Sequence, residues 1–172
     1  MAWYDRFRQR ILRILLKAKR PRDTERTPLP LQQAKTIGIL FHAADPFNND
    51  KLMAFVQDLK RANKEIQLLG YVDQRDPYQK YPFPFISRKE TTWYGKPGGG
   101  TAGYFMRSPF DLLINFCPDT CPPLDYITAV SPSRFRVGFH PEGDILDYDL
   151  ILISKEKGDI SNLIANLENY LR

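Results

Sequence analysis

The sequence has few of the residues that build disulfide or metal sites. Among its 172 residues there are two cysteines, Cys117 and Cys121, and two histidines, His42 and His140. A disulfide-stabilised domain needs more cysteines, and a redox pair usually has two intervening residues, not three. All four residues follow predicted strands, so a four-ligand zinc site at one sheet edge is geometrically permitted. Two ordinary half-buried thiols are the simpler interpretation, and we expect no metal and no cofactor.

The sequence also lacks long hydrophobic runs. No segment approaches the roughly 20 apolar residues that cross a bilayer. At the N-terminus, five basic residues interrupt any apolar core of a signal peptide, namely Arg6, Arg8, Arg10, Arg13 and Lys17. We therefore expect a cytoplasmic protein, with a position peripheral to the inner membrane as one alternative.

A complete phosphate-binding motif is absent as well. The segment GKPGGGTAG at 95–103 is rich in glycine, but the order Gly-Lys-Ser/Thr is missing. Such loops bind phosphate because a strand delivers backbone amides to the start of a helix. The sequence predicts neither a strand before these glycines nor a capped helix after them. A flexible surface loop is therefore the favoured interpretation.

Positive charge is concentrated in the first part of the chain. Residues 1–35 hold 10 of the 25 Lys and Arg residues and 3 of the 20 Asp and Glu residues, a balance of +7. The remainder holds 15 basic and 17 acidic residues, a balance of −2. Any attraction to an anionic partner must therefore come mainly from the N-terminal arm.

The N-terminal arm has the pattern of a basic amphipathic helix, with apolar residues at helical spacing and basic residues mostly opposite. It could pack on the body, lie in a membrane interface or dock on a protein or ribonucleoprotein partner through residues 1–26. Sequence-specific nucleic-acid binding is not expected, since no basic and aromatic surface pattern continues into the body. The predicted docking residues are Trp3, Phe7, Arg10, Ile11, Arg13 and Lys17.

The rest of the chain reads as one α/β domain. Apolar segments at 36–41, 66–72, 110–115, 135–140 and 148–153 predict strands, and 83–87 is a candidate edge strand. Helices are expected from a cap at 48–50 to about 63, at 123–130 and at 160–171. The run at 110–115 is apolar almost throughout, which is typical of a strand buried on both faces of a parallel sheet. We predict a single Rossmann-like domain over 35–172 with about five mostly parallel strands, preceded by a helix and linker over 1–34.

In such a sheet, ligands bind beyond the carboxyl ends of the strands. His42 or His140 with Asp119 could carry out acid–base chemistry there. Caps and turns explain polar residues at strand ends equally well. The other polar residues expected at this edge are Asp45, Asp73, Asn115 and Lys155.

Three segments together resemble a family of short, uncharacterised bacterial proteins, known as a domain of unknown function. They are KTIGIL at 35–40, WYGKP at 93–97 leading to FDLLIN at 110–115, and SPSRFRVG at 131–138. The resemblance covers about 35–172 and implies the fold but no activity. FDLLIN followed by a helix and by FRVGF at 135–139 is also similar, more faintly, to the N-terminal half of heptosyltransferase-like glycosyltransferases. Those enzymes bind the nucleotide-sugar mainly through a second domain, so this likeness implies a half-enzyme without transfer chemistry.

Two functional hypotheses follow. The first is a non-catalytic interaction or adaptor module whose basic N-terminal helix docks on a membrane surface or a partner. The second is a small enzyme or ligand-binding domain that uses the crevice at the carboxyl edge of the sheet. A pocket in which His42, Asn115 and His140 converge would favour the second hypothesis.

Overall fold

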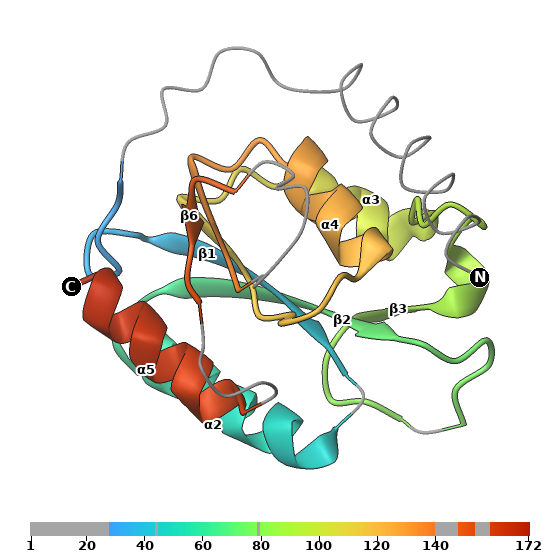
Figure 1. Cartoon of the computed structure of the whole chain (residues 1–172), viewed down its shortest axis with the longest axis horizontal. Helices are drawn as coiled ribbons and strands as arrows, with labels where there is room; N and C mark the ends of the chain where they lie inside the picture. Colours follow the sequence, from blue (N-terminus) through green and yellow to red (C-terminus); the bar gives the residue numbers. More distant parts are fainter. Residues whose placement is uncertain (1–27, 44, 79, 140–147, 154–158) are drawn as a thin grey trace.

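The computed structural model describes residues 28–43, 45–78, 80–139, 148–153 and 159–172. Its centre is a six-stranded sheet in which every neighbouring pair of strands is parallel (Figure 1). The strands are β1 (Thr36–His42), β2 (Glu65–Val72), β3 (Phe85–Ser87), β4 (Leu112–Asn115), β5 (Phe135–Gly138) and β6 (Leu150–Ile151). The helices are α2 (Pro46–Arg61), α3 (Gly99–Arg107), α4 (Pro122–Val130) and α5 (Ile160–Tyr170), with a 3-10 turn at Arg88–Glu90.

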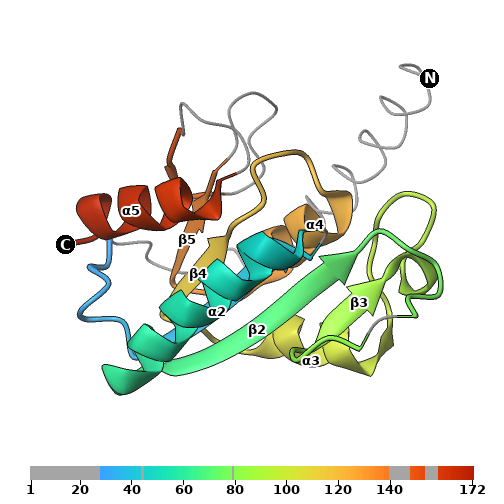
Figure 2. The same cartoon turned by 90° about the horizontal axis from the view of Figure 1, so that it is seen from below.

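The helices form a layer on each side of the sheet. Helices α2 and α5 lie side by side on one face, and α3 and α4 cover the other (Figures 1 and 2). Side chains alternate between the faces along each strand. In β1, Ile37, Ile39 and Phe41 join the core under α2 and α5, whereas Leu40 joins the core under α3 and α4. Two apolar cores therefore sandwich the sheet.

The strand order is β3-β2-β1-β4-β5-β6. This is the order of the Rossmann fold, in which the chain winds outward in both directions from the two central strands. The predicted α/β fold is confirmed, with six strands instead of about five. The difference comes from the edges, because β3 and β6 span only three and two residues.

Strand β4 lies at the centre of the sheet, as the apolar run predicted. All four of its residues are buried. Asp111, just before it, accepts hydrogen bonds from the backbone amides of Lys35 and Thr36 at 2.8 and 3.1 Å. These bonds hold the register of β4 against β1, so both strands end at the same edge.

In the connection from β2 to β3, aromatic side chains pack against the sheet where a crossover helix usually lies. Phe83 is buried and meets Phe41 edge-on, with 4.8 Å between the ring centroids. Tyr81 contacts both Phe83 and Phe85. Gly70 makes room for this packing, since a Cβ there would lie 2.9 Å from the Phe83 ring. Tyr81, Phe83 and Phe85 thus complete the core under α2.

The glycine-rich segment is not the flexible loop that its composition predicted. Helix α3 begins inside it, with Gly98 as its N-cap. The prediction was wrong because glycine has low helix propensity and three glycines stand together here. Tertiary packing overrides that propensity, since Ala102 and Phe105 are buried against the sheet.

Several element boundaries also differ from the predicted ones. Helix α2 starts at Pro46, not after a cap at 48–50, and proline is favoured in the first helical position. The last strand pairs only over Leu150–Ile151, not over 148–153. Leu29 and Ala34 are buried in the core, so packing on the α/β body starts ahead of β1. The predicted N-terminal helix lies outside the described residues.

Candidate functional site

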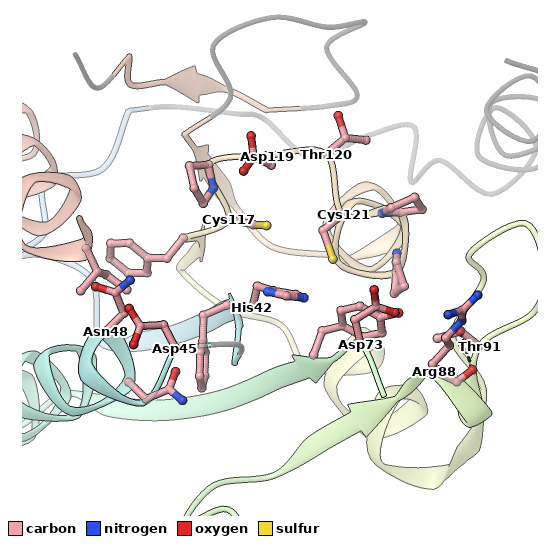
Figure 3. A pocket seen from close by; sticks show the side chains of 18 of the residues that line it. His42, Asp45, Asn48, Asp73, Arg88, Thr91, Cys117, Asp119, Thr120 and Cys121 are labelled. Carbon is pink, nitrogen blue, oxygen red and sulfur yellow. Dashed lines mark hydrogen bonds between the residues drawn. The ribbon is translucent and has the colours of Figure 1, made fainter. Parts of the chain in front are cut away.

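A crevice of about 630 Å³ opens beyond the carboxyl ends of β1, β2, β3 and β4. It lies at the point where the chain order reverses between β1 and β4, which is where ligands bind in open α/β sheets. Its volume falls within the usual range for small-molecule sites. Figure 3 shows the side chains of His42, Asp73, Cys117 and Cys121 pointing into the same hollow.

His42 is the last residue of β1, and parallel pairing places it beside Tyr71 of β2. The two ring centroids are 5.6 Å apart. Burial lowers the pKa of His42, and the carboxylates of Asp73 and Asp119 oppose that effect in part. The imidazole is therefore mainly neutral at neutral pH, with a donor and an acceptor nitrogen to offer a ligand.

Asp73 follows β2 directly and lines the crevice. It accepts a hydrogen bond from the Tyr71 hydroxyl at 3.1 Å. Burial and the neighbouring Asp73 carboxylate raise the pKa of Tyr71, so the phenol stays protonated and remains a donor. This wall of the crevice therefore pairs one hydroxyl with one carboxylate.

Cys117 and Cys121 lie on the connection between β4 and α4, and both are buried free thiols. The hydrogen-bond partner Cys117 and burial raise the pKa of Cys121 well above its ordinary value. A thiol needs a lowered pKa to act as a nucleophile. Cys121 is accordingly a neutral, polarisable part of the crevice wall.

The start of α2 forms another wall, to which Asp45, Asn48 and Asn49 contribute. The backbone amide of Asn49 donates to the carbonyl of Asp45 at 3.0 Å. In dinucleotide-binding domains this connection is a glycine-rich loop that lets phosphate approach the helix. Here it carries a carboxylate and Pro46, which supplies no N–H.

The residues at 88–93 close the crevice from the side of β3. Arg88, Thr91, Thr92 and Trp93 all line it. The candidate edge strand at 83–87 indicated that this segment lies near the edge of the sheet, but the individual lining residues were not predicted, because the parallel pairing of β3 with β2 positions them.

Asn115 does not line the crevice, contrary to the prediction. It is buried beside β5 and β6, where its amide donates to the Tyr148 hydroxyl at 2.7 Å. That hydroxyl donates to Asp125 Oδ1 at 3.2 Å, and Asp125 Oδ2 accepts from the Cys121 backbone amide at 3.1 Å. Burial raises the pKa of Asp125 to about 7. Asn115 therefore supports the crevice loop from behind.

The structure brings together four of the predicted site residues, His42, Asp45, Asp73 and Asp119. His140 and Lys155 lie outside the described residues, as do all the docking residues predicted in the N-terminal arm. Within the described ranges, no group of three or more His, Cys, Asp or Glu residues is arranged to hold a metal ion. No helix in the described part of the chain combines the length and apolar character needed to cross a membrane.

The parallel strand order and the crevice at its reversal point define a Rossmann-type α/β domain with an open crevice. The chain belongs to the Family of unknown function (DUF6913), whose model matches residues 5–172. The match includes most of the N-terminal arm and so extends beyond the predicted range of 35–172. Comparisons with curated proteins and with solved structures give no match, so neither supports the faint resemblance to glycosyltransferases.

Proposed function

We propose that this chain is a small-molecule-binding domain, with the crevice beyond β1, β2 and β4 as its binding site. The observation that carries the proposal is the coincidence of two independent features. The fold has its ligand-binding position at the β1–β4 reversal, and a hollow of about 630 Å³ lies there.

The chemistry of the lining supports ligand binding more than covalent catalysis. His42 is neutral and Cys121 is held as a thiol, so the wall offers hydrogen bonds and polarisable surface. Phe41 and Phe116 supply apolar surface beside them. Ligand sites typically combine such an apolar lining with a few convergent polar groups.

The adaptor hypothesis depends on residues 1–26, which lie outside the described residues, and it stays a prediction. Fractionation of the native protein with and without residues 2–26 would test it. Loss of sedimentation with membranes or ribosomes only in the shortened form would support docking through the arm.

A thermal-shift screen of the full-length chain tests the binding proposal. We expect at least one compound class to raise the melting temperature, because a ligand that binds only the folded state stabilises it. Thr120→Trp places a large ring on the exposed rim of the crevice and should abolish the shift. Thr101→Trp, at an exposed position on α3 away from the crevice, is the matched control and should keep it.

A further inference from the structure

Two carboxylates of the crevice have unused hydrogen-bonding capacity. Within the described part of the chain, Asp73 accepts one hydrogen bond, from Tyr71, and Asp119 accepts none. A carboxylate can accept about four hydrogen bonds through its two oxygens. Both residues are exposed, so solvent takes that capacity when no ligand is bound. A ligand that displaces this water must supply hydrogen-bond donors of its own.

The charges lining the crevice are mainly negative. Three carboxylates come from separate connections, Asp45 after β1, Asp73 after β2 and Asp119 after β4, and Arg88 is the one residue with a guanidinium or ammonium group among the described lining residues. His42 adds little positive charge, because burial lowers its pKa. The local field therefore favours a cation, and a concave site strengthens such a field.

The start of α2, where this fold usually binds anions, is unsuited to an anion in this chain. A phosphate at the start of α2 would face the carboxylate of Asp45, and Pro46 offers it no N–H. The run of three glycines in this chain, Gly98–Gly100, lies at the start of α3 instead, and none of the glycines in the described ranges lines the crevice. Phosphorylated ligands are thus disfavoured at the point where other Rossmann-type domains bind them.

A hydrated metal ion fits less well than an organic cation. The described residues hold no three-ligand metal cluster, and thiols and aromatic rings line the same crevice as the carboxylates. The indole of Trp93 lines the same crevice and is half-exposed, and indole faces attract organic cations. We propose that the crevice binds a compact organic amine in its protonated form, with the ammonium group against Asp73 and Asp119. This inference rests on the proposed binding function.

A matched series of five-carbon probes tests the inference on the full-length protein. Pentane-1,5-diamine, pentane-1,5-diol and pentanedioate share a chain length and differ in the charge of their ends. We expect the diamine to shift the backbone NMR signals of residues 42, 73 and 117–121. Its apparent affinity should exceed that of the diol and the diacid by at least about tenfold and should fall with added salt.

Two matched variants test whether the carboxylate of Asp73 binds the ammonium group. Asp73→Asn should weaken diamine binding by at least about tenfold, since it removes a partner charge and keeps the side-chain shape. Asp76→Asn is the control, because Asp76 lies on the same connection, pairs with Lys89 at 3.1 Å and does not line the crevice. Equal losses in the two variants would overturn the inference by showing a general charge effect.

The remaining outcomes separate the inference from the proposed function. If the diacid or a nucleotide binds at least as tightly as the diamine and Thr120→Trp abolishes that binding, the crevice binds ligands but the amine inference is wrong. If no cationic, neutral or anionic compound of the thermal-shift screen binds, both are wrong.

Discussion

Asp125 shows how a single buried side chain supports the crevice. It lies in the first turn of α4, and its carboxyl oxygens accept hydrogen bonds from the Cys121 backbone amide and the Tyr148 hydroxyl. Tyr148 reaches this position over Gly138, where a Cβ would lie 2.5 Å from the ring. The carboxyl group therefore links α4 to the crevice loop and to the segment before β6.

This position makes stability depend on pH. Because burial raises the pKa of Asp125 to about 7, against 3.8 in an unfolded chain, the folded state holds the proton more tightly. The resulting stabilisation is fully present below about pH 4 and is lost as the pH rises through about 7, by up to about 4 kcal/mol. Urea unfolding from pH 4.5 to 8 would measure this slope, and Asp125→Asn should remove it.

His42 contributes a slope of the opposite sign, since its lowered pKa makes protonation destabilising. The difference between the wild-type and Asp125→Asn profiles isolates the carboxyl group from this effect. Parallel profiles for the two proteins would show that Asp125 is not the titrating group.

Helix α3 is an element whose existence depends on its surroundings. Its first two residues are Gly99, at a φ of 84°, and Gly100, where an added Cβ would meet nothing within 4 Å. Only the first of these positions requires glycine. The second glycine weakens the helix without serving its geometry.

Two alanine substitutions in α3 should therefore have opposite effects. Gly100→Ala should stabilise the protein by about 0.5 kcal/mol, because it reduces the freedom of the unfolded chain. Gly99→Ala should destabilise it by about 1 kcal/mol or more, because a Cβ is strained at positive φ. Chemical denaturation measures both, and destabilisation by Gly100→Ala would show that its backbone is not free to accept a side chain.

At the scale of the whole molecule, the segment ahead of β1 packs on the domain and contacts its C-terminal end. Leu29 is buried in the core under α2 and α5, and the Leu31 amide donates to the Leu171 carbonyl at 2.7 Å. This segment links the two ends of the described domain across the outer layer. It is therefore part of the fold and does not act as a free linker.

Truncation of the buried side chain tests that view. Leu29→Ala in the full chain should lower the free energy of unfolding by about 2 to 5 kcal/mol, the usual cost of a buried leucine. Gln33→Ala, at an exposed position in the same segment, should change it by less than about 0.5 kcal/mol. Equal effects would mean that Leu29 contributes no core packing.

The position of the crevice could be predicted from the sequence, but the full set of residues that line it could not. His42, Asp73 and Asp119 follow predicted strands, and a parallel sheet brings such residues to one edge. Arg88 and Trp93 follow the short edge strand β3, and Asn115, at the end of β4, hydrogen-bonds Tyr148 and does not line the crevice. The apolar pattern of a strand predicts that its side chains alternate between two faces, but it does not predict which helices cover each face.

The sequence by itself determined the α/β class, the buried central strand and the presence of a helix near 160–171, which the cap residue Asp159 begins. Each of these depends on neighbours within a few residues, such as the apolar run of β4 or Asp159 accepting the Ser161 amide at 2.9 Å. The tertiary structure alone decided that glycines start a helix, that aromatic rings replace a crossover helix and which polar groups share the crevice. Those outcomes depend on contacts between residues far apart in the chain, which local patterns do not record.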